Sequence, residues 1–87
     1  MATVFVPPQL RDVTGGADRI EASGATVREV IDEFEARFPG IAARLLDGEH
    51  LAAGLAVSID GTLSNRGLQA AIGKDSELHF LPALGGG

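Results

Sequence analysis

The strongest periodic pattern in the chain predicts one amphipathic helix of about three turns, from residue 26 to residue 38. Thr26 and Glu29 have the spacing of a capping box, in which the hydroxyl accepts the Glu29 amide hydrogen and the carboxylate reaches back. Pro39-Gly40 ends the helix, because a proline biases the residue before it away from helical geometry. The apolar residues that recur at helical spacing along one stripe are Val27, Val30, Ile31, Phe34 and Phe38.

Short runs rich in β-branched and aromatic residues predict four strands around this helix. Residues 3–6 and residues 19–22 flank a glycine-containing loop, an arrangement typical of an opening hairpin. Residues 56–59 predict a third strand. Residues 78–81 predict a fourth, and it runs into a proline, which is confined to strand ends and edges.

Weaker signals complete the prediction of a single α+β domain. Residues 41–46 predict a further helical turn, Asp60-Gly61 a chain reversal, and residues 67–73 a loop. If Ser58 faces water, the side chains on either side of it in the third strand, Val57 and Ile59, face the core.

Composition narrows the function classes. A chain of 87 residues is long enough for one domain, and the absence of cysteine excludes disulfides, thiolate metal sites and a cysteine nucleophile. The net charge is −5, whereas a nucleic-acid binder ordinarily has a basic patch, so we do not expect binding to nucleic acid. No apolar run is long enough to span a membrane, and the first residues lack the pattern of a signal peptide, so we expect a cytoplasmic protein.

The end of the sequence carries a family resemblance. Residues 78–82 predict a strand that ends in a proline, and Leu84 and three glycines follow within five positions. This ending resembles the ubiquitin-like sulfur carriers of the MoaD/ThiS family, which finish in a terminal diglycine. Within that family the resemblance is nearest to the CysO-like carriers, although many of them have another small residue where Gly85 stands. Further matching segments are residues 14–16, 22–26, 39–41, 44–45 and 81–83.

The resemblance implies an α+β fold of the ubiquitin-like β-grasp type, a mixed sheet of four to five strands with one main helix packed on it. In this fold the first and last strands are expected to be parallel neighbours at the centre of the sheet, joined by a long crossover. We expect residues 1–83 to form the β-grasp domain and residues 84–87 to form a flexible glycine tail with the reactive C-terminus.

The resemblance also implies the chemistry, with the carboxylate of Gly87 as the reactive group. An E1-like enzyme of the MoeB, MoeZ or ThiF type adenylates it with ATP, and a sulfur donor converts the acyl-adenylate to a thiocarboxylate. A biosynthetic enzyme, for example a cysteine synthase or a thiazole-synthase-like enzyme, then accepts the sulfur. Gly85 and Gly86 have no Cβ, so the tail can thread a narrow channel in the partner. The chain itself is expected to be a carrier rather than an enzyme, to bind no cofactor, and to be a monomer when free.

Alternation within the strands predicts a docking surface beside this tail. Leu78 and Phe80 are assigned to the side that the helix covers, so their neighbours point the other way. An exposed apolar patch on a small domain is typical of a protein interface. The alternative is that these side chains pack under a loop or are exposed singly. The predicted docking residues are Phe5, His79, Leu81, Pro82 and Leu84.

Other sites find little support in the sequence. His50 and His79 lie far apart and have no acidic residues at ligand spacing, so we expect no metal site. The carboxylates Asp32, Glu33 and Glu35 are interpreted as a solvated helix face. No nucleophile–base arrangement or phosphate-binding loop is recognisable.

Two other functions stay open at this point. The chain could be a ubiquitin-like modifier conjugated to lysines through Gly87, or a passive β-grasp interaction module with an inert tail. The acceptor of a carrier is open as well, because cysteine, molybdopterin, thiamine and sulfur-containing metabolites all draw on carriers of this type.

Overall fold

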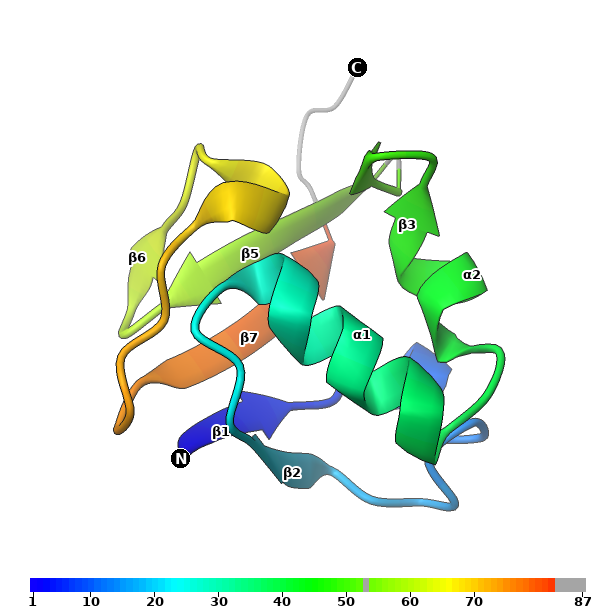
Figure 1. Cartoon of the computed structure of the whole chain (residues 1–87). Coiled ribbons are helices and arrows are strands. Elements are labelled where there is room, and N and C mark those ends of the chain that lie inside the picture. Colours follow the sequence, from blue (N-terminus) through cyan, green and yellow to red (C-terminus); the bar gives the residue numbers. More distant parts are fainter. Residues whose placement is uncertain (53, 83–87) are drawn as a thin grey trace.

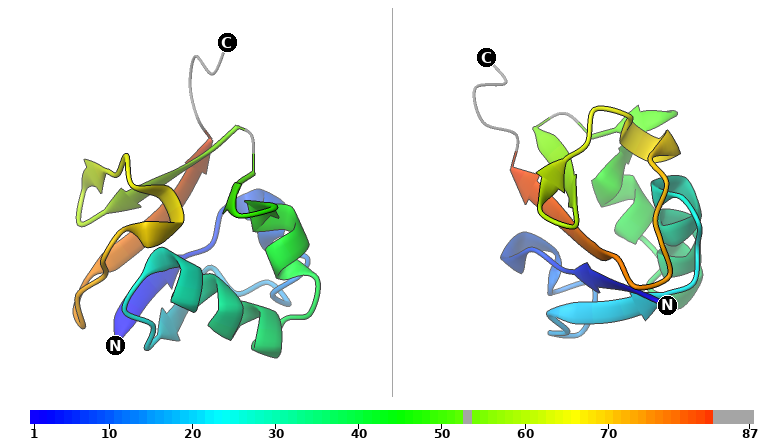
Figure 2. Two further views of the ribbon diagram at one scale, coloured as in Figure 1. Left: turned by 45° about the horizontal axis from the view of Figure 1, so that its top comes forward. Right: turned by 90° about the vertical axis from the view of Figure 1, so that its left-hand side faces the viewer.

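A five-stranded mixed sheet and one long helix make up most of the computed structural model, which describes residues 1–52 and 54–82. The helix lies across one face of the sheet and leaves the other face open (Figures 1 and 2). In chain order the elements are β1 (Ala2–Phe5), η1 (Pro8–Leu10), β2 (Arg19–Ala22), α1 (Val27–Arg37), α2 (Ile41–Leu45), β3 (Leu46–Asp47), β4 (His50–Leu51), β5 (Leu55–Ile59), β6 (Thr62–Leu63), η2 (Gly67–Gln69) and β7 (Glu77–Pro82).

The sheet has the strand order β2-β1-β7-β5-β6, so the last strand of the chain is the middle strand of the sheet. β1 pairs antiparallel with β2 and parallel with β7, which places Val4 beside Leu78. β5 pairs antiparallel with β7 on its other side. The predicted β-grasp fold, its opening hairpin and its central parallel pair are therefore confirmed.

The core lies between the sheet and α1, and it includes most of the residues that the two periodicities predicted. Phe38, predicted on the same helical stripe, is the C-cap of α1 and is only half-buried. The helix residues Val27, Val30, Ile31 and Phe34 are each at most 1% exposed. The inward strand residues Val4, Val57, Leu78 and Phe80 meet them and are at most 4% exposed. Burying such a side chain contributes about 1.5–3 kcal/mol, so this interface provides much of the stability of the fold.

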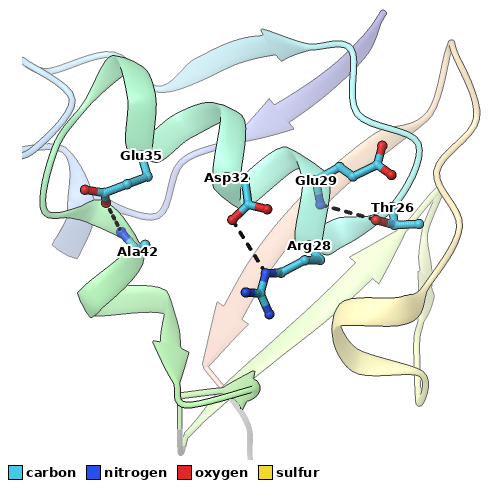
Figure 3. A network of polar contacts seen from close by, with 6 residues as sticks. All are labelled: Thr26, Arg28, Glu29, Asp32, Glu35 and Ala42. Carbon is cyan, nitrogen blue, oxygen red and sulfur yellow. Dashed lines mark hydrogen bonds and ion pairs between the residues drawn. The ribbon is translucent and has the colours of Figure 1, made fainter.

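The entrance of α1 departs slightly from the predicted capping box. The Thr26 Oγ1 accepts the Glu29 amide at 3.2 Å, as predicted. The Glu29 carboxylate, however, accepts the amide of Ala25 at 2.9 Å rather than that of Thr26. Figure 3 shows the Thr26–Glu29 bond at the first turn of the helix. The Thr26 hydroxyl and the Glu29 carboxylate therefore both hold the first turn of α1 against the loop that precedes it.

The acidic residues of α1 correct the interpretation of a simple solvated face. Glu33 accepts the amides of Ser23 and Gly24, at 3.0 and 3.1 Å. Glu35 accepts the amides of Gly40 and Ala42 at 3.0 and 2.9 Å, and so ties α1 to the start of α2 (Figure 3). Sequence periodicity identified these positions as non-core, but it carried no information about which loop amides lie opposite them.

Asp32 does lie on the exposed side of α1. Its carboxylate pairs with Arg28 one turn earlier, at 3.5 Å. An exposed pair at this spacing stabilises a helix by only about 0.3–0.5 kcal/mol. The three carboxylates that the sequence grouped together therefore divide into one surface group and two groups that fasten loops to the helix.

Two further details differ from the sequence predictions. Within the predicted loop of residues 67–73, η2 turns Leu68 into the core, and Ile72 is also buried because its amide bonds to the loop before α1. Ser58 does not face water freely, since it is only 8% exposed. It lies on the open face but between β6 and β7, beside Leu63 and His79.

The predicted turn at Asp60-Gly61 joins β5 to β6 and also holds β7. Both residues have positive φ, 54° and 86°, as a two-residue hairpin turn of type I′ requires. The Asp60 carboxylate accepts the Glu77 amide at 2.8 Å and the Ser76 hydroxyl at 2.9 Å. One side chain therefore fixes the turn and the first residue of the central strand together.

No helix within residues 1–52 and 54–82 combines the length and the apolarity needed to cross a bilayer. The predicted domain boundary at residue 83 and the tail of residues 84–87 lie outside the described residues.

Gly24→Ala should lower the free energy of unfolding by about 1–3 kcal/mol, the usual cost of overpacking. A Cβ at this position would lie 2.8 Å from the backbone nitrogen of Val30, so the loop or the helix must move. Urea denaturation measures the change. The control is Gly73→Ala, whose Cβ would meet only the Ser76 hydroxyl, at 3.2 Å. Equal stabilities for the two variants would contradict the close approach of the loop to α1.

Glu35→Gln should destabilise the protein at neutral pH, with a difference that disappears in acid. The amides of Ala42 and Gly40 favour the charged carboxylate and lower the pKa of Glu35 below 4.5. A lowered folded-state pKa contributes stability above the unfolded pKa, and that stability is lost as the pH falls through the folded pKa. Urea midpoints from pH 7 down to below pH 4.5 should therefore converge for the variant and the wild type.

The control for that comparison is Glu49→Gln, because Glu49 is exposed at the β3–β4 turn. Its midpoint should follow the wild type at every pH. A constant offset between Glu35→Gln and the wild type across the whole pH range would contradict the role of the charged Glu35 carboxylate.

Candidate functional site

The central strand β7 leads directly to the segment that the sequence predicts to be reactive. β5 pairs with β7 as far as Pro82, whereas β1 pairs with it only as far as His79. Pro82 is the last described residue. Leu84, Gly85, Gly86 and Gly87 lie outside the described residues, so their assigned roles stay predictions. The structure nevertheless gives the position from which this segment starts, at the end of the middle strand.

Two prolines cause β1 to leave β7 early. Pro7 has no amide hydrogen and cannot continue the ladder, and Pro8 begins the short helix η1. The chain turns away after Phe5, so the β1 side of Leu81 stays unpaired within the described residues. This departure opens a groove at the end of the sheet from which the last residues continue.

The open face of the sheet carries an aromatic row beside this groove. Strand register places Arg19, Phe5 and His79 side by side on three neighbouring strands. The rings of Phe5 and His79 stack with their centroids 4.2 Å apart and their planes 3° from parallel. The guanidinium carbon of Arg19 lies 5.5 Å from the Phe5 centroid, within the range of a cation–π contact. The row lies on the sheet face opposite α1, because the alternate residues Val4 and Leu78 of the same strands are buried in the core.

The groove has a volume of about 380 Å³. Its apolar lining includes Phe5, Val6, Pro7 and Leu81, and His79 lines it from the middle strand of the sheet. The charged residues that line it are Arg11, Asp18 and Arg19. An apolar groove with charged groups at its edge suits a side chain of another protein better than a polar small molecule.

The structure brings together three of the five predicted docking residues. Phe5, His79 and Leu81 are half-buried and line the same groove. Pro82 lies at the end of β7, opposite Leu55. Leu84 lies outside the described residues. Docking itself stays a prediction, because the structure contains no partner chain.

Sequence reasoning missed Arg19 and Pro7 as parts of this surface. Arg19 occupies an outward position of the predicted hairpin strand, and antiparallel pairing with residues 3–6 could have placed it opposite Phe5. Pro7 was recognised only as the end of a strand. Its contribution to a groove depends on β7 lying next to β1, which is a tertiary relation.

A larger cavity, of about 560 Å³, lies on the helix side of the molecule and has a different character. It is lined by polar and charged side chains that include Arg28, His50 and Arg66. Of the predicted docking residues, Phe5, His79 and Leu81 do not line it. Among the described residues, no group of three His, Asp or Glu side chains is arranged to hold a metal ion.

The sequence model of one family, described as the ThiS family, matches residues 4–87. That range covers both the described domain and the glycine end. The chain belongs to the ThiS family.

Relatives within and beyond this family agree with the fold. The sulfur carrier protein CysO of Mycobacterium tuberculosis is 36% identical over 90 residues, which cover 98% of this chain and 97% of that protein. A chain in the crystal structure of the Amycolatopsis orientalis BexX/CysO complex is 40% identical and superimposes with a TM-score of 0.91, with both chains fully covered. The small archaeal modifier protein 1 of Methanosarcina acetivorans is 20% identical and has a TM-score of 0.79 over 99% of this chain and 95% of that one. At that identity it shows a shared fold alone.

Leu81→Asp should weaken binding of this ThiS-family chain to the predicted E1-like partner at least tenfold, or about 1.4 kcal/mol, because a charge would enter the apolar groove. The double variant with Leu84→Asp should bind more weakly still. The control is Leu63→Asp, since Leu63 is 67% exposed on the edge strand of the same face and outside the groove. Calorimetric titration gives the affinities, and urea denaturation checks that the variants fold. Unchanged affinity in the double variant would refute the docking surface.

Proposed function

We propose that this protein is a sulfur carrier whose cargo is held on the carboxylate of Gly87. The observation that supports this most strongly is the full-length similarity to CysO sulfur carriers, 36% over 98% of the chain. The family match extends through residue 87, so the glycine end is part of the similarity and not an addition to it.

The proposed chemistry exchanges one oxygen of the carboxylate for sulfur. In the first step a Gly87 carboxylate oxygen attacks the α-phosphorus of ATP, and pyrophosphate leaves. In the second step hydrosulfide, the simplest sulfur donor, attacks the acyl carbon, the acyl–oxygen bond to AMP breaks, and AMP leaves; loss of the proton from sulfur gives the thiocarboxylate. An E1-like enzyme of the MoeB, MoeZ or ThiF type performs both steps and consumes the ATP. The protein takes part as a co-substrate and not as a catalyst.

The tail and the domain have separate roles in this proposal. Gly85 and Gly86 have no Cβ, so they suit a channel too narrow for other residues. Ordering them costs about 1–2 kcal/mol per residue, which the partner's contacts with the domain must offset. The groove around Phe5 and Leu81 is the part of the domain that we assign to those contacts. The domain is therefore a handle, and residues 84–87 present the cargo.

An accepting enzyme completes the proposed cycle. The CysO chain at 40% identity was crystallised in a complex with BexX, which supports a carrier that docks on a second protein. A cysteine synthase or a thiazole-synthase-like enzyme is the proposed kind of acceptor. We place this exchange in the cytoplasm, where ATP is available to the activating enzyme.

The modifier function receives less support than the carrier function. The similarity to an archaeal modifier protein is 20%, which shows the fold alone, whereas the similarity to sulfur carriers reaches 36–40%. Isopeptide-linked conjugates of the protein in cell lysate would nevertheless favour the modifier function. Full function after deletion of residues 86 and 87 would favour the passive interaction module instead.

Intact mass spectrometry tests the carrier function directly. Incubation with an E1-like enzyme, ATP and a sulfur donor should raise the mass by the exchange of one oxygen for sulfur. Deletion of Gly86 and Gly87 should abolish the shift, because the chain then ends without the diglycine. Competence of the enzyme is established on a CysO protein in the same experiment. Absence of a shift with the cognate, competent enzyme would contradict the proposal.

A further inference from the structure

His79 occupies the centre of the open face, in a row of stacked side chains. Its ring lies 4.2 Å from that of Phe5 and parallel to it within 3°. β2 and β7 flank β1, so Arg19 and His79 approach Phe5 from opposite sides. The ring of Phe5 therefore has one permanent cation on one side and a titratable ring on the other.

The charged groups around His79 are of both signs. Arg19 lies across Phe5, and Arg11 and Asp18 line the groove. Glu77 lies two residues earlier on the same face of β7, and the neighbour on β5 is the neutral Ser58. Neither of the ion pairs within residues 1–52 and 54–82 includes His79. Protonation would thus bring a second cation to a ring that already has one.

Histidine is the side chain whose charge ordinarily changes between about pH 5 and pH 8. A neutral His79 adds an uncharged aromatic surface to the groove. A protonated His79 must lose part of its hydration when another surface covers it, and burial of an unpaired charge is unfavourable. The state of this one ring therefore changes how well the groove accepts an apolar side chain.

The position of the groove identifies its occupant. Gly87 lies five positions after Pro82, and five residues span at most about 18 Å when fully extended. An enzyme that encloses Gly87 must therefore reach close to the end of β7. Leu81 lines the groove and directly precedes Pro82, so the surface of that enzyme meets the groove when it takes the tail.

We propose that His79 makes docking depend on pH: the enzyme that takes Gly87 places an apolar side chain in the groove beside neutral His79, and protonation of His79 weakens the complex. This inference rests on the proposed carrier function, because that function requires an enzyme at the end of β7. It adds that the Arg19–Phe5–His79 row contributes to the specificity of docking, and that this row favours binding when His79 is neutral.

The test compares wild-type protein with His79→Phe, which keeps an uncharged aromatic ring in the row. The probe is the E1-like enzyme of the mass experiment, and its dissociation constants for both proteins are measured between about pH 5 and pH 8. The quantity compared is the dissociation constant of wild type divided by that of His79→Phe. Titration of the enzyme's own groups affects both constants and therefore cancels in this ratio. This ratio should rise about tenfold from the alkaline to the acidic end, with wild type the weaker binder in acid.

Two further variants make the comparison specific. His50→Phe changes the other histidine, which is exposed on β4 and outside the groove, so it should keep the wild-type pH dependence. His79→Gln removes the titration without an aromatic ring and should also lose the pH dependence, although it should bind more weakly than His79→Phe. Urea denaturation at both ends of the pH range confirms that each variant is folded where binding is measured.

The outcomes separate this inference from the carrier function. A mass shift shows that the carrier function is intact. If the ratio for His79→Phe is then constant with pH, or if His50→Phe loses the pH dependence, the role of His79 is overturned. A ratio that rises as expected without any mass shift supports the docking element and overturns the chemistry at Gly87. Absence of both the mass shift and binding overturns both.

Discussion

The parallel pairing of β1 with β7 is the constraint on which the rest of this structure depends. These strands come from opposite ends of the described chain, yet they lie side by side, with Val4 next to Leu78 and both fully buried. Antiparallel neighbours can be joined by a short turn, but parallel neighbours require a long crossover. Everything between β2 and β5 belongs to that crossover, including α1. The helix of this crossover packs on one side of the sheet, so the other side stays open (Figures 1 and 2).

The fastening of α1 follows from this arrangement. A domain of this size buries a limited surface, and a helix that forms the whole of one layer needs its flanking loops held as well as its apolar stripe. Carboxylates of α1 accept loop amides near both ends, Glu33 those of Ser23 and Gly24, and Glu35 those of Gly40 and Ala42. Two of the acidic residues, Glu33 and Glu35, thus hold the segments on either side of α1 in place.

The same pairing places the functional elements together. Because β7 is the middle strand, its end is supported by β5 while β1 diverges at Pro7, and the groove forms where the two separate. The chain therefore continues toward Gly87 from a rigid element that adjoins an apolar surface. Both features serve the proposed function, in which a partner recognises a folded surface and reaches the Gly87 carboxylate in one complex. In this protein the surface also includes the imidazole ring of His79, which the strands hold against Phe5.

Local patterns were sufficient for much of this description. Helical spacing predicted which residues of α1 are buried, strand alternation predicted that Leu78 and Phe80 face inward, and Asp60-Gly61 predicted its turn, because each depends on neighbours within a few residues. The end of the chain and its family resemblance pointed to Gly87 without any structure. Tertiary structure alone decided the remainder. The amides that face Glu33 and Glu35, the burial of Ile72, and the stack of Arg19 on Phe5 on His79 all join segments that only the folded sheet brings together, and no pattern within one segment records the distance to another.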